Sequence, residues 1–164
     1  MTNLDKLAPT SRVWVYQSSR AFSESESETI AQLAQKFAHS WAAHGRELVA
    51  AGSLLHHRFL VLAVDEQLAG ASGCSIDTSV GFVRELQSTY AVDFLDRMQF
   101  AFRDERGEVR TATRAAFAQL YAAGVIDDDT LVFDTLVATL ADLQNRFEVP
   151  LGQSWHKRMV GIAV

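Results

Sequence analysis

ELVAAGSLLHHRFLVLAVDE, residues 47–66, predicts two consecutive strands, because branched and hydrophobic side chains dominate both of its halves. The halves are residues 47–57 and 58–66, and no Asn-Gly type of turn separates them. Gly52 is a candidate bulge, which leaves the register of the pair open. RVWVYQ (12–17) and residues 97–103 alternate with a period of two and predict one strand before this pair and one after it.

Helices are predicted on both sides of the strand pair. Ser23 and Glu26 have the spacing of a capping box, and Gly45 is placed to end the helix that begins there. A second helix over residues 76–90 has Ser75 or Asp77 as its cap. The first helix carries one apolar stripe at spacings of three and four, made of Ile30, Leu33, Ala34, Phe37, Ala38 and Trp41.

The resulting order βαββαβ predicts an α+β fold with a ferredoxin-like core over residues 1–104, in which two helices cover one face of a four-stranded antiparallel sheet. Residues 105–164 are predicted to pack on this core as a C-terminal α/β extension. Within it, a helix over 114–123 ends at the glycine cap Gly124. Residues 130–147 fit either a strand followed by a helix or one continuous helix, and we prefer the first.

The composition favours a cytoplasmic globular protein. The 164 residues are 48% hydrophobic and carry a formal net charge of -5, with no run of Lys or Arg. This balance argues against nucleic acid or an anionic membrane as a partner. No apolar run suits a signal peptide or a membrane span, and a single cysteine, which forms no internal disulfide, suits a reducing compartment.

Six segments spread along the chain carry a resemblance: VWVYQSSR, FAHSWAAHG, RFLVLAVDE, ASGCSIDTSV, TLVFDTLV and QSWHKR. They resemble a family of small bacterial proteins whose members often carry the label "ABC transporter ATPase". The resemblance implies no activity, because the chain lacks the glycine-rich P-loop with its Lys and hydroxyl residue. We therefore expect neither ATPase activity nor a cofactor.

A second, local resemblance covers residues 100–137. FAFRDERG and RAAFAQLYAAGVIDDDTLVF follow the order of strand, helix, glycine and strand, with aromatic residues at Phe100 and Phe102. This pattern is similar to the small GYF-type modules that bind peptides. The chain departs from it between Glu108 and Thr111, where the glycine-proline-aromatic segment is absent, so binding of proline-rich peptides is not implied.

Cys74 lies at the start of the second predicted helix, in GASGCSIDTSV (70–80). Free N–H groups at a helix N-terminus stabilise a thiolate, so Cys74 is a candidate nucleophile. His44 would then be its general base and Asp77 the group that orients the base. We prefer the simpler interpretation, in which Cys74 is a small buried side chain in a tight turn and Asp77 caps the helix.

No metal site is expected from the histidines or the acidic run. His56 and His57 are adjacent on a predicted strand and would face opposite sides of the sheet. His39 and His44 are five positions apart, which is unsuited to one helical face. Residues 127–129, all Asp, lack the ligand pattern of a calcium loop and predict a solvated turn.

Aromatic and arginine side chains provide the candidate ligand-binding residues, because a flat ring beside a guanidinium suits a small anion or a peptide carboxylate. The candidates are Trp41, Arg20, Ser72, Ser75 and Arg97, with Trp14, Tyr16, Trp155 and Arg158 as further members of such a groove. The periodicity of Trp14 and Trp41 favours the core for these two.

The preferred function is a small-molecule or peptide binding or interaction protein without ATPase activity. Its expected partner is a small anionic ligand or a peptide, with a homodimer through an exposed sheet edge as a further option. The alternative is a thiol-dependent enzyme that uses Cys74.

Overall fold

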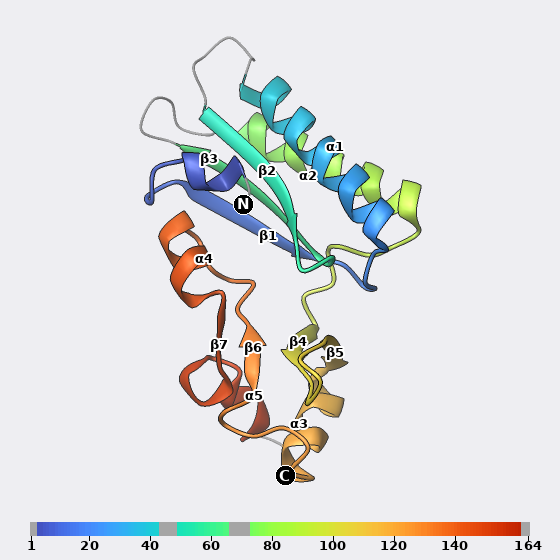
Figure 1. The fold of residues 1–164 in the computed structure, drawn as a ribbon, viewed down its shortest axis with the longest axis vertical. Coiled ribbons are helices and arrows are strands. Elements are labelled where there is room, and N and C mark those ends of the chain that lie inside the picture. Colours follow the sequence, from blue (N-terminus) through green and yellow to red (C-terminus); the bar gives the residue numbers. More distant parts are fainter. Residues whose placement is uncertain (1–2, 43–48, 66–72, 162–164) are drawn as a thin grey trace. The chain divides into compact units, whose positions relative to one another are not determined.

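The computed structural model describes residues 3–42, 49–65 and 73–161, with the side chains of its second long helix from residue 76 onward (Figure 1). The elements are η1 (Asn3–Lys6), β1 (Arg12–Gln17), α1 (Glu24–Ala42), β2 (Val49–Leu55), β3 (Phe59–Asp65), α2 (Gly73–Tyr90), β4 (Gln99–Arg103), β5 (Val109–Thr113), α3 (Arg114–Ala122), β6 (Leu131–Phe133), α4 (Leu140–Arg146), β7 (Glu148–Pro150), η2 (Leu151–Gln153) and α5 (Lys157–Val160).

The chain forms two compact units, each of which is discontinuous in sequence. The first unit consists of Met1–Leu95 with Leu136–Gln144, and the second unit of Asp96–Thr135 with Asn145–Val164. The boundary predicted from the sequence lies after residue 104.

The first unit is built on a three-stranded antiparallel sheet in the order β1–β3–β2. β3 lies between β1 and β2, which are joined through α1, as in a split βαβ unit. Every residue of β3 except Asp65 is buried, so both faces of this strand are covered. The prediction of an α+β architecture with antiparallel sheets is confirmed.

The prediction that residues 97–103 form the fourth strand of this sheet is wrong, and so is the prediction of a complete ferredoxin-like core. Residues 99–103 form β4, which pairs with β5 and β6 in a second sheet. Beside β1 runs the segment 138–140 instead, where the N–H of Val13 donates to the carbonyl of Ala138 (3.0 Å). Alternating hydrophobicity predicts a half-buried strand, but it does not identify the sheet to which the strand belongs.

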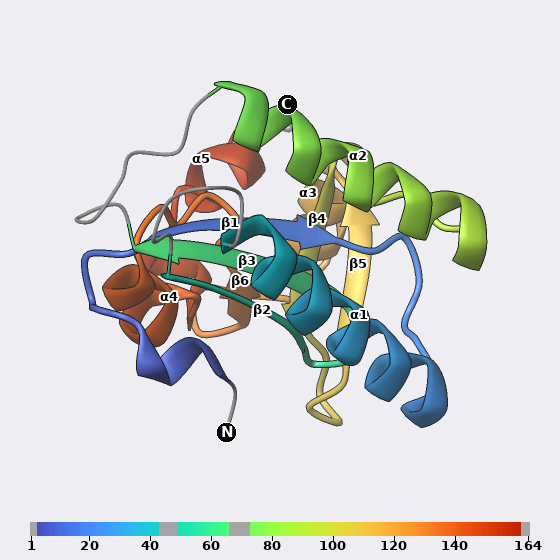
Figure 2. The ribbon, with the colours of Figure 1, turned by 90° about the horizontal axis from the view of Figure 1, so that it is seen from above.

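α1 and α2 lie side by side over one face of the first sheet (Figure 2). The capping box is confirmed, because the N–H of Glu26 donates to Ser23 Oγ (3.2 Å) and the N–H of Ser23 donates to Glu26 Oε1 (3.0 Å). The predicted stripe faces the sheet, with Ile30, Ala34, Ala38 and Trp41 buried and Leu33 and Phe37 partly buried.

α2 begins at Gly73, earlier than predicted. Ser75 and Asp77 therefore lie inside its first turns, and the prediction that one of them is the N-cap is wrong. The predicted end of α1 at Gly45 lies outside the described residues.

His56 and His57 form the tight turn between β2 and β3. Both have positive φ, 52° and 55°, and the N–H of Arg58 donates to the carbonyl of Leu55 (3.0 Å). Two consecutive residues with positive φ are typical of the centre of a type I′ turn, and here one extra residue, Arg58, follows them before the pair Leu55–Phe59. Histidine is more tolerant of this conformation than most side chains, which explains a hairpin without Asn-Gly.

Gly52 pairs regularly with Leu62, so the predicted bulge is wrong. The glycine instead allows a close approach of α1 to the sheet. A β-carbon at residue 52 would lie 2.5 Å from the backbone oxygen of Ala34 in α1. Only a residue without a side chain fits at this contact.

The face of the first sheet away from α1 and α2 is also covered. Val13, Val15, Val61 and Ala63 alternate with the residues of the helix-side cluster, and all four are buried. Five buried hydrophobic residues of the same unit lie outside that cluster and are available to cover this face: Leu4, Leu7, Val137, Leu140 and Leu143.

The second unit has a four-stranded sheet in the order β5–β4–β6–β7 around a small aromatic core. The rings of Phe100 and Phe102 both pack on Phe117 of α3. The glycine cap of α3 is confirmed: Gly124 has φ 74°, its N–H donates to the Tyr121 carbonyl and the N–H of Val125 donates to the Leu120 carbonyl. The preferred strand-then-helix assignment of residues 130–147 is confirmed by β6 and α4.

Among the helices that the structure describes, none combines the length and the apolar character that a bilayer crossing requires.

We predict that Gly52→Ala lowers the free energy of unfolding of the first unit by about 1–3 kcal/mol, because the added methyl group displaces α1. Gly81→Ala is the matched control: it lies in α2, a β-carbon there meets nothing within 4 Å, and alanine favours a helix by up to about 1 kcal/mol over glycine. Urea denaturation measures both variants. Equal stability of Gly52→Ala and the parent protein would show that the close contact is unimportant.

Candidate functional site

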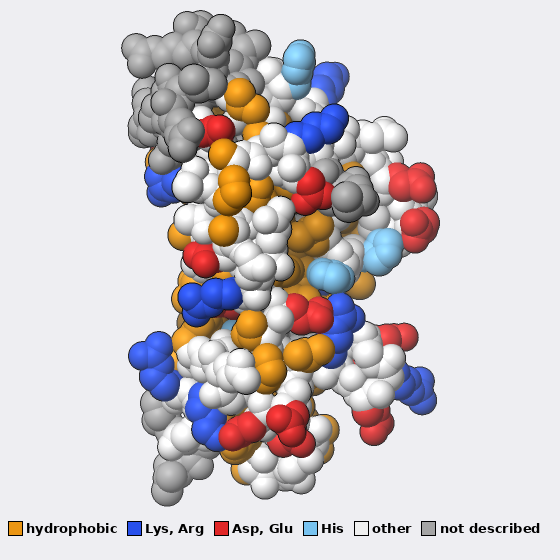
Figure 3. Space-filling model, turned by 60° about the vertical axis from the view of Figure 1, so that its left-hand side comes forward, with side chains coloured by type: hydrophobic (Ala, Val, Ile, Leu, Met, Phe, Trp, Pro, Cys, Tyr) orange, Lys and Arg blue, Asp and Glu red, His pale blue; other side chains and the backbone are white. Residues whose placement is uncertain are grey.

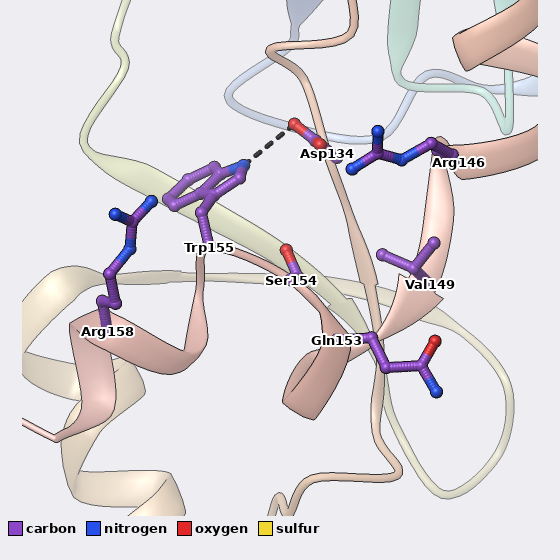
Figure 4. A pocket seen from close by; sticks show the side chains of 7 residues that line it. All are labelled: Asp134, Arg146, Val149, Gln153, Ser154, Trp155 and Arg158. Carbon is purple, nitrogen blue, oxygen red and sulfur yellow. Dashed lines mark hydrogen bonds between the residues drawn. The ribbon is translucent and has the colours of Figure 1, made fainter.

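A pocket of about 490 Å³ lies in the second unit, between the end of β6, β7 and α5 (Figure 4). This volume falls within the range of small-molecule binding sites. Seven residues line the pocket: Asp134, Arg146, Val149, Gln153, Ser154, Trp155 and Arg158.

Backbone pairing brings these residues together from separate elements. Asp134 directly follows β6, and its N–H donates to the carbonyl of Phe147 (2.7 Å), next to Arg146. Val149 pairs with Val132 across β6 and β7. The turn η2 then ends where the N–H of Ser154 donates to the carbonyl of Leu151 (3.1 Å), and the chain continues into α5 with Arg158.

The indole of Trp155 is held in place on several sides. Its Nε1 donates to Asp134 Oδ1 (2.9 Å), as Figure 4 shows. Its ring stacks on His156 with centroids 3.8 Å apart and an angle of 20° between the planes. The ring of Phe100 contacts it edge-on at 5.5 Å. A side chain fixed in this way is a preorganised wall for a ligand.

His156 is the buried partner in this stack and is 1% exposed. Burial lowers its pKa from 6.5 to about 4, although the nearby charge of Asp134 acts in the opposite direction. Its Nδ1 lies 2.7 Å from Ser154 Oγ, so the hydroxyl satisfies one ring nitrogen. At neutral pH the imidazole is uncharged, and His156 is a structural support for Trp155.

The charges at the pocket favour an anion. Arg146 and Arg158 are exposed, and neither guanidinium group forms an ion pair or hydrogen bond with another residue in the described part of the chain. Figure 4 shows their guanidinium groups on either side of the Trp155–Ser154 segment. Asp134 adds one negative charge, so the two arginines leave the lining with one formal positive charge. A guanidinium pairs most favourably with a carboxylate or phosphate, through two parallel hydrogen bonds.

Trp155 and Arg158, two of the further groove candidates, line this pocket, whereas the other candidates lie elsewhere. Trp41 is buried in the core of the first unit, 5.9 Å from the ring of Trp14. Arg20 pairs with Glu26 (2.9 Å) and donates to the carbonyl of Tyr90, so it joins α1 to α2. Arg97 is exposed in the second unit and is not part of the pocket lining.

The structure does not describe the side chains of the two serine candidates or of most residues of the predicted thiol site. Ser72 and His44 lie outside the described residues. Cys74 and Ser75 belong to α2, but their side chains are not described. Asp77 is exposed on α2. The thiol site therefore stays a prediction.

Asp134, Arg146, Val149, Gln153 and Ser154 were missed by the sequence analysis. A weak signal existed for some of them, because QSWHKR places four polar or charged side chains beside Trp155 and His156. An acidic residue at the end of the hydrophobic run LVF, at Asp134, is another such signal. Neither pattern specifies that the two segments meet in space.

Comparison of the chain with protein-family models, with curated proteins and with solved structures finds no match. The two resemblances given above stay predictions, and the geometry alone carries the functional argument. Within the described ranges, no three His, Cys, Asp or Glu side chains gather in a way that could hold a metal ion.

We predict that the second unit loses about 2 kcal/mol of stability as the pH falls from about 6.5 to about 4.5. In this pH window His156 takes up a proton in the unfolded chain, whereas in the folded state its lowered pKa keeps it neutral down to about pH 4. Glu26 and Asp104 have lowered pKa values in the folded state, so their protonation also reduces stability, but only near and below their ordinary pKa values of 4.5 and 3.8.

Urea denaturation at stepped pH measures this dependence. His156→Phe keeps an aromatic ring in the stack and should remove the slope between pH 6.5 and 4.5. His39→Gln, which replaces an exposed histidine of α1, should retain it. An unchanged slope in His156→Phe would show that another group titrates.

Proposed function

We propose that the protein is a binding protein without ATPase activity, whose second unit binds a ligand through a carboxylate group. The observation that carries this proposal is the pair of guanidinium groups, Arg146 and Arg158, at a pocket whose aromatic wall is fixed in advance. The carboxylate belongs either to a small organic acid or to the C-terminus of a peptide. Both sources present the same group to the two arginines.

The apolar part of the lining supports a ligand with a hydrophobic side chain next to its carboxylate. Trp155 and Val149 are half-buried and border the same space as the arginines. Gln153 and Ser154 add neutral donors and acceptors. A few polar groups that converge on an apolar wall are typical of ligand sites.

The proposal includes a cytoplasmic location, which the single cysteine supports, because one thiol forms no internal disulfide. Homodimer formation through a sheet edge is a separate proposal, which sedimentation velocity tests directly.

We predict that a peptide with a free C-terminal carboxylate, such as acetyl-Ala-Leu-Phe, binds at least about tenfold more tightly than its C-terminal amide, because charged hydrogen bonds contribute about 1.5–3 kcal/mol. The pair 3-phenylpropionate and 3-phenylpropionamide tests the small-acid source in the same way. Calorimetry gives the affinities, and a thermal shift that follows mass action checks them.

Arg158→Gln and Arg146→Gln should each weaken binding of the free acid about tenfold and leave binding of the amide unchanged. Arg114→Gln is the matched control, since Arg114 is an exposed arginine at the start of α3 in the same unit and lies outside the pocket. Equal affinity for acid and amide, or no binding of any of the four compounds at millimolar concentration, would refute the proposal.

A further inference from the structure

The second unit has another hollow, distinct from the carboxylate pocket. It has a volume of about 800 Å³ and shares no lining residue with that pocket. We call it the acidic groove. Its lining comes from the β4–β5 hairpin and from the segment between α3 and β6, and it includes Phe102, Glu105, Val125, Asp127, Asp129 and Leu131.

Local hydrogen bonds fix the hairpin side of the acidic groove. Asp104 Oδ1 accepts from the N–H groups of Arg106 (2.9 Å) and Glu108 (3.0 Å). Gly107 has φ 80°, which closes the turn. The turn is further held by Arg103, whose Nη1 donates to the carbonyl of Gly107 (2.7 Å).

The opposite side is fixed by the glycine cap of α3 and by a turn at Asp127. Asp127 Oδ1 accepts from the N–H groups of Asp129 (2.9 Å) and Thr130 (3.2 Å). The N–H of Asp127 in turn donates to Thr130 Oγ1 (2.9 Å). Both sides are therefore preformed, which reduces the entropy lost when a partner binds.

The lining of the acidic groove includes hydrophobic side chains. Val125 is 68% exposed, the largest exposed fraction among the big hydrophobic residues that the structure describes. Leu131 is half-buried, and two further lining residues, Ile126 and Phe102, are buried. An exposed valine beside a hollow offers apolar area that a partner can cover.

The charged side chains of the acidic groove favour a partner with positive charge. Two of its charged side chains are already compensated: Arg103 pairs with Glu148 (2.7 Å) and Asp104 with Arg110 (2.9 Å). The remaining three, Glu105, Asp127 and Asp129, have no cation within ion-pair distance in the described part of the chain. Figure 3 shows Asp and Glu side chains beside hydrophobic ones on the part of the molecule that holds β4–β7.

We propose that the acidic groove docks a basic peptide segment of another protein, one in which Lys or Arg alternates with hydrophobic side chains. The hydrophobic side chains of the segment cover Val125 and Leu131, and its cations pair with Glu105, Asp127 and Asp129. Charge complementarity of this kind increases the association rate and excludes acidic partners. The proposal is independent of the carboxylate pocket.

Calorimetry with three amidated and acetylated peptides tests the proposal on the full chain. Lys-Leu-Lys-Leu-Lys should bind, whereas Glu-Leu-Glu-Leu-Glu and Lys-Ser-Lys-Ser-Lys should bind at least about tenfold more weakly, because they lack the charge or the apolar part. Binding should weaken when salt is raised from about 0.05 M to about 0.5 M. No peptide has a terminal carboxylate, but the acidic peptide has side-chain carboxylates that suit the carboxylate pocket. Its affinity is therefore compared with that of the basic peptide in the double variant Arg146→Gln/Arg158→Gln, in which that pocket has lost both guanidinium groups.

The double variant Glu105→Gln/Asp129→Asn should weaken binding of the basic peptide about five- to tenfold, and Val125→Ser should weaken it about fivefold. Asp127 is left unchanged because its carboxylate holds the turn. The matched control Glu28→Gln/Glu85→Gln makes the same change of charge on α1 and α2 of the first unit and should bind like the parent.

Equal binding of the acidic and basic peptides by Arg146→Gln/Arg158→Gln would overturn the proposal, and so would an absence of binding of the basic peptide at millimolar concentration. Equal weakening by the groove variant and the control variant would overturn it too, because the attraction would then come from the net charge of the chain. Circular dichroism of each variant confirms that it is folded.

Discussion

Burial of β3 on both faces is the constraint on which the first unit depends. Because β3 has no exposed face, other elements must pack on both sides of the sheet, and α1 and α2 pack on only one side. The buried residues Val137, Leu140 and Leu143 come from a segment far away in the sequence. The need to cover a fully apolar strand therefore explains why both units are discontinuous.

The carboxylate pocket likewise depends on a buried side chain, His156, which is not part of the pocket lining. His156 stacks beneath Trp155 and stays neutral because burial outweighs the attraction of Asp134. The pocket therefore keeps its two guanidinium groups free of competition from an imidazolium. Of the residues that line the pocket, Asp134 and Arg146 are the nearest in sequence to the segment 136–144, one before it and one after it.

The sequence predicted local features well and long-range pairing poorly. The capping box at Ser23 and the glycine cap at Gly124 depend on residues within one turn, and both are present. The sheet that contains β4 depends on contacts of Phe100 and Phe102 with Phe117, which periodicity does not encode.

At the site, Trp155 and Arg158 could be proposed because an aromatic ring beside an arginine has recognisable chemistry. Asp134 and Arg146 could not be linked to them, because only the pairing of β6 with β7 brings these segments together. Gly52 shows the same limit, since a glycine in a strand indicates either a bulge or a close backbone approach. The first unit is completed by residues 138–140, which lie along the edge of β1. A protein truncated after residue 95 would therefore lack the segment that pairs with β1, and it would not be an intact domain.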